Sequence, residues 1–265
     1  MTAVYIESVG LFAPGLIGWH DSRAVLAGNA AYQFNALPKY KPQLLPANER
    51  RRASAAVRLA FGACEDAVGE RLRDAEQLAA VFASSGGDYI INDQICRVLC
   101  QHDKAVSPTQ FHNSVHNAAA GYWSIASKSR AASVSLSAYD DSVGAGIIEA
   151  YTLVAVERLP VMLVCSDNQI GPPLNKHRSV SQPFAAALWL AAERSEHTIA
   201  GLDIAVHTGT GEQTPPINPA LALLHSANPA ARLLPVLELL ARTEAGTVCL
   251  PMTCAQTLQV ALSPC

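Results

Sequence analysis

The chain has 265 residues, of which 50% are hydrophobic and 15% are charged, enough to build a full hydrophobic core in one large α/β domain or two small ones. This apolar composition excludes intrinsic disorder, and it favours a sheet covered on both faces or a surface buried against a partner. The net charge of −3, from 19 basic and 22 acidic residues, excludes the basic footprint of a nucleic-acid-binding protein.

Membrane insertion and export are not expected. The longest uninterrupted apolar stretch, residues 184–192, is nine residues long, against the roughly 18 that a membrane-spanning helix needs. Glu7 lies where a signal peptide would have its apolar region.

Cysteine usage indicates a reducing, cytoplasmic compartment. The cysteines form no CxxC pair and no zinc-type spacing with histidine, so we expect no metal site. Most of them fall in apolar segments, which predicts buried thiols. They are Cys64, Cys96, Cys100, Cys165, Cys249, Cys254 and Cys265.

Apolar periodicity predicts strands that alternate with helices. Strands are expected at residues 4–9, 78–83, 133–138, 160–165, 184–190 and 199–206, with a closing hairpin from 248–250 and 257–262. Helices are expected at residues 22–27, from 49 onward, and at 90–100, 118–127, from 142 onward, 221–225 and 233–242. Residues 35–48 and 107–117 are expected to be irregular.

This order of elements predicts an α/β fold with a mixed, five-stranded sheet between layers of helices. The character of the sequence changes after His197. We therefore expect one domain over residues 1–195 and a small C-terminal α+β appendage, residues 196–265, packed on it.

Three short motifs are weak candidates for a site. His112 and His116 have the i, i+4 spacing of a zinc protease, but Asn113 stands where the general base would be, which favours hydrogen bonds to backbone or an interface. The run from His207 to Gly211 lacks the lysine of a phosphate-binding loop. The turn after residue 83 is expected to be an ordinary strand-to-helix turn with Asp88 as the helix N-cap.

Residues 133–150 are the most informative segment, because a buried strand runs there sharply into a helix. Such a turn lies at the positive end of the helix dipole, where a thiolate is stabilised, and an acyl-transfer enzyme would carry cysteine there. This chain has Tyr139, Asp140, Asp141 and Ser142 instead. Aspartate and serine are also good N-caps, so a simple capped helix explains the same residues.

This segment resembles the strand-turn-helix of the thiolase-fold β-ketoacyl synthases, Thr-Ala-Cys-Ala-Ser-Gly followed by an Ile-x-Glu-Ala-like stretch. Aligning Ser142 and residues 147–150 with that pattern puts Asp140 where the nucleophilic cysteine would stand. Residues 4–15, 45–52 and 107–125 resemble the opening strand, the approach to the first long helix and a loop and helix near the dimer interface. The stretches 82–88 and 111–117 are similar to the short chain length factors of aryl polyene biosynthesis.

The departures from the family decide what the resemblance implies. A complete ketosynthase has two pseudo-repeated halves and two catalytic histidines, whereas this chain ends soon after the first half, and the match of residues 207–209 to the histidine motif is interpreted as a coincidence. An acyl-aspartate would be a hydrolysable anhydride, so Asp140 is no substitute for a thiolate. We therefore expect no catalytic residue and no cofactor.

The resemblance implies a non-catalytic subunit that pairs as a heterodimer with a full-length β-ketoacyl-ACP synthase in aryl polyene (polyketide- or fatty-acid-like) biosynthesis. Such a subunit shapes the tunnel for the acyl or polyene chain and meets the acyl carrier protein through that partner. The tunnel or interface candidates are His112, His116, Asn117, Tyr122, Trp123, Tyr139, Asp140, Asp141 and Ser142.

Two alternatives remain open on sequence alone. One is that the chain is a stand-alone acyltransferase or decarboxylase that uses Asp140 or Asp141 with His112 or His116, since paired carboxylates beside an apolar pocket can have raised pKa values. The other is a thiolase-fold homodimer with an unrelated structural task.

Overall fold

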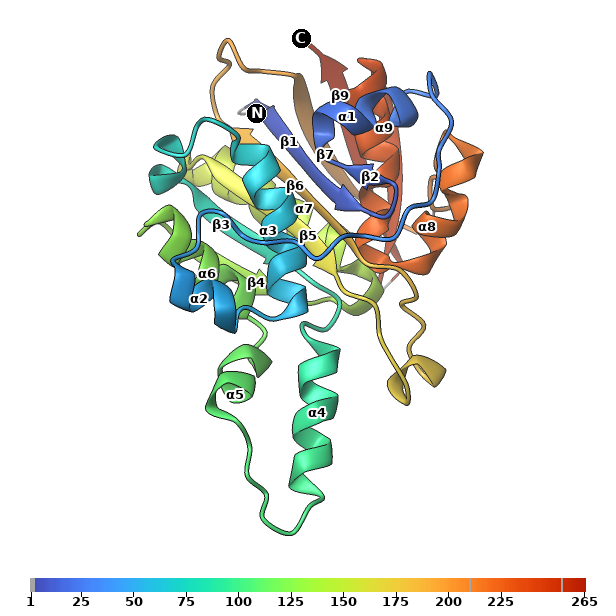
Figure 1. The fold of residues 1–265 in the computed structure, drawn as a ribbon. Coiled ribbons are helices and arrows are strands. Elements are labelled where there is room, and N and C mark those ends of the chain that lie inside the picture. The colour runs from blue at the N-terminus through green and yellow to red at the C-terminus, as the bar shows by residue number, and fades with distance from the viewer. Residues whose placement is uncertain (1–2, 210, 254) are drawn as a thin grey trace.

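The computed structural model describes residues 3–209, 211–253 and 255–265. Within these ranges nine strands form one mixed sheet in the order β4-β3-β5-β6-β1-β7-β9-β8, with β2 beside β1 (Figure 1). The strands are β1 (Val4–Ala13), β2 (Leu16–Ile17), β3 (Ala79–Ala83), β4 (Ser133–Leu136), β5 (Val161–Asp167), β6 (Phe184–Ala191), β7 (Ala200–Thr208), β8 (Gly246–Met252) and β9 (Gln256–Pro264).

Helices cover both faces of this sheet. On one face α3 and α6 enclose a core with the strands, and on the other α1, α7 and α9 enclose a second, larger core. The α-helices are α1 (Trp19–Leu26), α2 (Ala47–Arg52), α3 (Ala55–Val68), α4 (Tyr89–Leu99), α5 (Pro108–Ser114), α6 (Ala118–Ser127), α7 (Ser142–Glu157), α8 (Ala222–Ala227) and α9 (Leu234–Arg242). The predicted α/β fold with a mixed sheet between helix layers is confirmed.

The period of two along a strand divides residues between the two cores. In β3, Ala80 and Phe82 pack against α3 and α6, whereas Val81 and Ala83 belong to the core under α7. All five residues of β3 are buried, which explains its continuously apolar sequence. On β1, a Cβ added at Gly10 would lie 1.9 Å from the carbonyl oxygen of Ala63, so α3 rests directly on this strand.

Strand direction brings several strand ends together. Strands β4 and β5 run parallel to β3, and β6 runs antiparallel to both β5 and β1. The carboxyl ends of β4, β3, β5 and β1 therefore meet at one edge of the sheet, which is the usual place for a ligand site in an open α/β sheet.

The C-terminal segment extends the sheet. Strand β7 pairs with β1, β9 pairs with β7, and β8, the first strand of a hairpin with β9, forms the outer edge. The five strands of residues 4–191 and the three of residues 200–264 thus share one sheet, with β2 at its margin. Among the described helices, none combines the length and apolar character required to cross a membrane.

Two predicted features differ from the structure around α5. Residues 108–114, expected to be irregular, form α5, which begins at Pro108 and is held by Asn113, whose Nδ2 donates to the carbonyls of Thr109 and Arg52. The helix expected from Glu49 is two helices, because the chain extends at Ala53 and Ser54, and Ser54 caps α3 through the amide of Val57.

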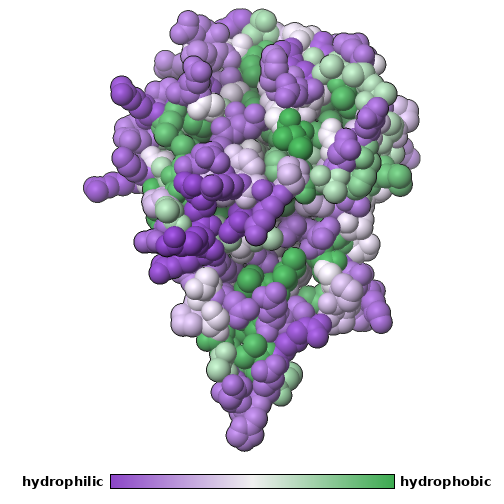
Figure 2. All heavy atoms as spheres, viewed as in Figure 1, coloured by the Kyte–Doolittle hydropathy of each residue, from purple (hydrophilic) through white to green (hydrophobic). Residues whose placement is uncertain are grey.

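Helices α4 and α5 form an arm that projects from the body of the molecule (Figure 1). No residue of α4, all of which the structure describes, is fully buried. Apolar side chains are exposed along this arm at the bottom of the view in Figure 2, with Leu99 at 48% and Phe111 at 66% exposure.

The cysteines are more exposed than predicted. The structure describes six cysteines, all of which are free thiols. Cys64 and Cys165 are buried, Cys249 is half-buried, and Cys96, Cys100 and Cys265 are exposed. Cys96 and Cys100 lie on the arm, whose apolar pattern reflects an amphipathic helix and not burial. Cys254 and Thr210 of the sequence motifs lie outside the described residues.

Candidate functional site

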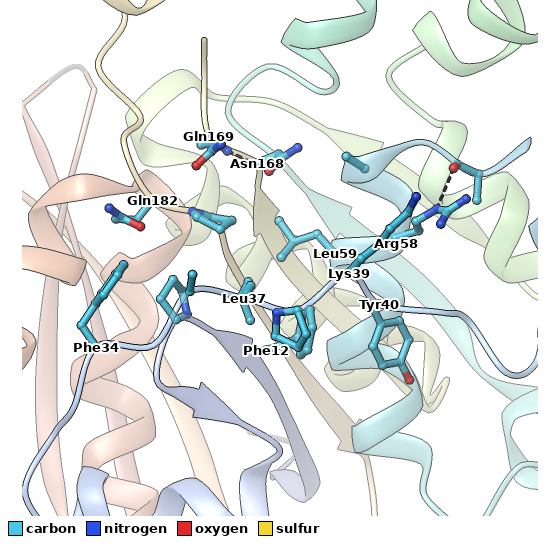
Figure 3. A pocket seen from close by; sticks show the side chains of 16 residues that line it. Phe12, Phe34, Leu37, Lys39, Tyr40, Arg58, Leu59, Asn168, Gln169 and Gln182 are labelled. Atoms are coloured by element: carbon cyan, nitrogen blue, oxygen red, sulfur yellow. Dashed lines mark hydrogen bonds between the residues drawn. The ribbon is translucent and has the colours of Figure 1, made fainter.

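Two cavities open near the carboxyl ends of the strands. The first, about 560 Å³, lies on the α3 side between α3 and residues 34–40 (Figure 3). The second, about 290 Å³, lies beside the turn that joins β4 to α7, and Asp140, Arg178, His225 and Arg232 are among its walls. The two cavities share no lining residue.

The turn between β4 and α7 is sharp, as the sequence predicts. Residues Tyr139–Asp141 form a single 3-10 turn, and Tyr139 adopts the left-handed conformation with φ of 54°, which is strained for an aromatic residue. Ser142 locks the turn: its Oγ donates to the carbonyl of Tyr139 at 2.8 Å and accepts from the amide of Ala138 at 2.9 Å.

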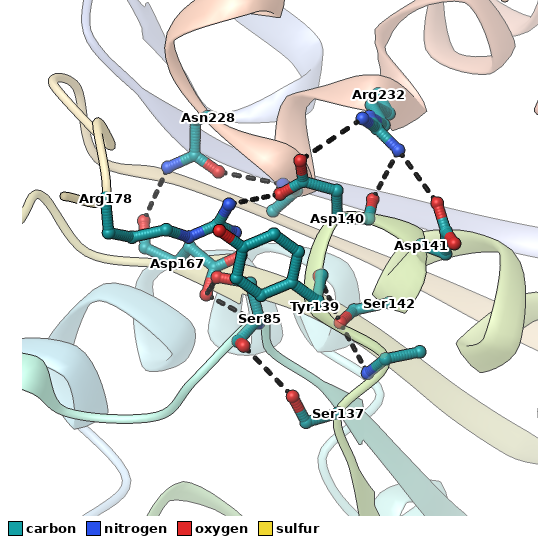
Figure 4. Close-up of polar contacts among 12 residues, drawn as sticks. Ser85, Ser137, Tyr139, Asp140, Asp141, Ser142, Asp167, Arg178, Asn228 and Arg232 are labelled. Atoms are coloured by element: carbon teal, nitrogen blue, oxygen red, sulfur yellow. Dashed lines mark hydrogen bonds and ion pairs between the residues drawn. The ribbon is translucent and has the colours of Figure 1, made fainter. Parts of the chain in front are cut away.

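Two arginines neutralise the two aspartates of the turn (Figure 4). Arg178 Nη1 lies 2.5 Å from Asp140 Oδ1, and Arg232 Nη1 lies 3.1 Å from Asp141 Oδ1. Arg232 also donates to the Asp140 carbonyl at 2.6 Å. The other Asp141 oxygen accepts the amide of Thr253 at 2.7 Å. Asp141 stands at the N-cap position of α7, but its side chain makes no capping hydrogen bond, because its carboxylate is used by Arg232 and Thr253.

The guanidinium of Arg178 also stacks on the ring of Tyr139, with 3.7 Å from Cζ to the ring centroid. Burial is the largest single effect on the pKa of Arg178 and lowers it, but the hydrogen bond and charge of Asp140 together with Tyr139 and Tyr89 outweigh burial and raise that pKa above the ordinary value. Arg178 therefore stays charged and holds both the ring and the carboxylate of the turn.

A buried aspartate lies behind this ion pair at the end of β5. Asp167 is 3% exposed, and its Oδ1 accepts from Ser84 Oγ at 2.8 Å and from the amide and hydroxyl of Ser85 at 2.8 and 2.9 Å. Burial raises its pKa to about 6, although these hydrogen bonds act in the opposite direction. Asn228 closes the cluster by donating to the Asp167 carbonyl at 2.8 Å.

This arrangement leaves little reactive chemistry at the turn. A stand-alone enzyme that uses Asp140 or Asp141 would need these carboxylates beside an apolar pocket. In the structure, each carboxylate instead forms an ion pair with an arginine. His225, in the cavity next to them, has its pKa lowered by burial and by Arg232. In the described ranges, no group of three or more His, Cys, Asp or Glu side chains is placed to hold a metal ion.

The remaining sequence candidates fall into a surface set and a core set. His112, on α5, is exposed, and its ring packs edge-on against Tyr122 at 5.6 Å. His116 lies beyond the end of α5, half-buried, with Nε2 3.4 Å from the Ser84 carbonyl, and Asn117 is exposed. Because α5 ends at Ser114, the two histidines do not share a helix face.

Tyr122 and Trp123 are both 1% exposed in the core between α3 and α6. Trp123 packs edge-on against Phe61 at 5.7 Å. Both therefore stabilise the domain through packing, and an additional role at a tunnel or interface stays a prediction.

Sequence reasoning missed Arg178, Arg232 and Asp167. Arg178 lies in the irregular connection between β5 and β6, and Arg232 contacts the turn from 91 to 92 residues away. Neither position belongs to a motif. Asp167 carried the one usable signal, since it is an acidic residue at the end of a strand that begins with five apolar residues.

Comparison with known proteins places this geometry in a family context. Residues 19–232 match the family described as beta-ketoacyl synthase, N-terminal domain. No curated protein sequence matches the chain.

Solved structures share the fold. One shows the ketosynthase ApeO in complex with its chain length factor ApeC from Xenorhabdus doucetiae, with 24% identity, a TM-score of 0.71, and coverage of 98% of this chain and 100% of that chain. Another is the ishigamide ketosynthase/chain length factor, with 13% identity, a TM-score of 0.73 and 99% coverage of each chain. A third, AntDE:AntF, is a type II polyketide synthase acyl-carrier protein in complex with its ketosynthase, with 13% identity, a TM-score of 0.77, and coverage of 100% of this chain and 99% of that chain.

Proposed function

We propose that this chain, which belongs to the β-ketoacyl synthase N-terminal domain family, is a non-catalytic subunit of the chain-length-factor type. It pairs with an active β-ketoacyl-ACP synthase and shapes the space that receives the acyl or polyene chain. The observation that carries this proposal is the turn at Asp140, where the family pattern has its nucleophilic cysteine and this chain has an aspartate bound to Arg178.

The ion pairs support the absence of catalysis by this chain alone. A catalytic nucleophile must be free to attack the thioester carbonyl of the substrate, and the acyl-enzyme that forms must then release its acyl group. Asp140 and Asp141 instead contact Arg178 and Arg232, so attack would require breaking these contacts. The exposed ring of Tyr139, stacked on Arg178, further covers the turn.

Unpaired surface supports a protein partner. The outer edge of β4 is paired with no strand in the described part of the chain, and a short open edge invites pairing with another chain. The arm adds Leu99 and Phe111, and Val115 follows directly after α5; all three are large, apolar and exposed. Together with solved complexes of a ketosynthase and its chain length factor among proteins of the same fold, this surface favours a ketosynthase as the partner.

The remaining parts of the proposal concern its setting. We assign the subunit to aryl polyene biosynthesis in the cytoplasm, where its free thiols would stay reduced, and place its contact with acyl carrier protein on the ketosynthase. Residues 1–195 form the ketoacyl-synthase-like domain in this proposal, and residues 196–265 are an appendage that lengthens its sheet.

Native mass spectrometry tests the proposal. The chain is measured alone and co-expressed with a candidate ketosynthase, in both cases after exposure to acylated carrier protein. A one-to-one complex with the acyl mass only on the ketosynthase is the expected result. A stable free homodimer that itself gains the acyl mass would overturn it and would favour a stand-alone acyltransferase with an unconventional nucleophile near Asp140.

A further inference from the structure

The larger cavity, on the α3 side of the sheet, has the dimensions of a small-molecule site. Its volume of about 560 Å³ falls within the range of roughly 300–1,000 Å³ found for ligand pockets. Four segments form its walls: the end of β1, residues 34–40, the start of α3, and the connection between β5 and β6.

The wall formed by residues 34–40 is fixed before any ligand arrives. At one end, Gly15 donates its amide to the Asn35 carbonyl at 2.9 Å. At the other, Tyr40 donates its hydroxyl to Glu65 of α3 at 2.6 Å, and its ring packs edge-on against Phe12 at 5.1 Å. A wall held in this way loses little conformational entropy on binding.

The middle of the cavity is apolar and partly open to water. Phe12, Leu37 and Leu59 line it together with Phe34, which is 57% exposed. A large aromatic side chain in water at the rim of an apolar cavity gains favourable free energy when a second apolar surface covers it.

Charge in the cavity has one sign. Of the described residues that line it, Lys39 and Arg58 are cations and none has a carboxylate. Arg58 is held in place by donating to the carbonyls of Ala53 at 2.9 Å and Arg50 at 3.1 Å. Figure 3 shows Lys39 and Arg58 on one side of the cavity, and Phe34 and Gln182 on the opposite side.

We propose that this cavity binds a small molecule with an apolar or aromatic body and one anionic end, of the class of acyl or aryl carboxylates. The anionic end lies against Lys39 and Arg58, the body contacts Leu37, Leu59 and Phe34, and the side-chain amides of Gln169 and Gln182 accept or donate at the far end. The inference goes beyond the proposed function and does not depend on it, because the cavity shares no lining residue with the one at Asp140.

A displacement assay on the isolated full chain tests the site. Anilinonaphthalene sulfonate, a fluorescent aryl anion, serves as the probe, and dodecanoate and dodecanol serve as competitors with the same body and different ends. Dodecanoate is expected to displace the probe at about tenfold lower concentration than dodecanol, because only the carboxylate meets the two cations. Equal displacement by the two competitors, or displacement by neither, would overturn the proposal.

Paired variants locate the binding. Lys39→Gln should weaken dodecanoate about fivefold and leave dodecanol unchanged, whereas Lys41→Gln, an exposed lysine two positions away that does not line the cavity, should change neither. Phe34→Ala should weaken both competitors by about fivefold. Leu223→Ala, which removes an exposed apolar side chain elsewhere, is the control.

Equal losses in the cavity variants and in their controls would show that the probe binds elsewhere and would overturn the assignment. All four substitutions replace exposed side chains, so unchanged thermal unfolding confirms that the variants are folded. The assay contains no ketosynthase and no carrier protein, so its failure would leave the proposed function untouched.

Discussion

The turn at Asp140 and the arm formed by α4 and α5 use their side chains in opposite ways. At the turn, each carboxylate meets a guanidinium, and Ser142 satisfies the local backbone. In the arm, Leu99 and Phe111 are left in water, and Gln110 Nε2 donates a hydrogen bond to Gln94 Oε1 at 2.9 Å between the two helices. The charges of the first region are paired within this chain, whereas the apolar side chains of the second have no cover.

The difference shows where a partner has free energy to gain. A turn whose aspartates are already paired with arginines offers an incoming protein no free carboxylate to bind, whereas covering apolar side chains on the arm removes them from water. In the proposed complex, the turn therefore serves the stability of this chain, and the arm serves assembly. Substitutions that affect one region and not the other test this difference.

The largest effect is expected from the arm. Leu99→Asp combined with Phe111→Asp should weaken the complex with a ketosynthase by about 100-fold or more, because carboxylates replace apolar contacts at the interface. The unfolding temperature of the free chain should change little, since both side chains are exposed. Titration calorimetry measures the affinity, with Val156→Asp combined with Leu223→Asp as the exposed control. Unchanged affinity would remove the arm from the interface.

A smaller effect is expected from pH at Asp167. Its pKa of about 6 in the folded protein is above the value of about 3.9 in an unfolded chain, so the folded state binds the proton more tightly. The unfolding free energy contributed by this group is therefore greatest below about pH 4, falls as the pH rises to about 6, and is constant above it. The total change is about 3 kcal/mol at most.

Denaturant titrations across this pH range measure the effect. Asp167→Asn should remove this component of the pH dependence, whereas Asp203→Asn, a change of an exposed carboxylate on β7, should leave it in place. Parallel curves for the wild type and Asp167→Asn would show that burial does not raise the pKa of this carboxyl group.

The smallest effect is expected at the turn itself. Asp140→Asn removes one charge from the pair with Arg178, and we expect a loss of about 1–2 kcal/mol in unfolding free energy, because the site is partly screened by solvent. Condensation by the complex with a ketosynthase should continue at a similar rate. Loss of that activity in a folded, assembled variant would give Asp140 a chemical role and end the contrast with the arm.

Much of the fold could be predicted because its elements are strongly periodic. The buried strands β3, β5 and β6 are continuous apolar runs, and α3 and α7 carry apolar faces at helical spacing. Asp88 was correctly predicted as an N-cap, and its Oδ1 accepts the amide of Ile91 at 3.0 Å. Helix α5 was missed because its polar residues have no apolar period, and its stability depends on Asn113 reaching Arg52.

The candidate site was predictable only in part. The strand-to-helix turn and Asp140 follow from a local pattern, but the interactions that define their chemistry come from Arg178 and Arg232, which lie far along the chain in segments without periodicity. Asp141 is of a residue type favoured at N-caps, and a sequence alone does not show that a distant arginine binds the same carboxylate. Long-range ion pairs leave no local signal.

The position of β1 has a consequence for how the chain is made. This ten-residue strand precedes the other eight described strands in the chain, yet both of its long neighbours, β6 and β7, come from residues 184–208. On the ribosome, an apolar strand with two open edges therefore waits for most of the chain to emerge, and such distant pairings form slowly. Synthesis, more than the finished fold, is the stage at which this protein depends on protection from aggregation.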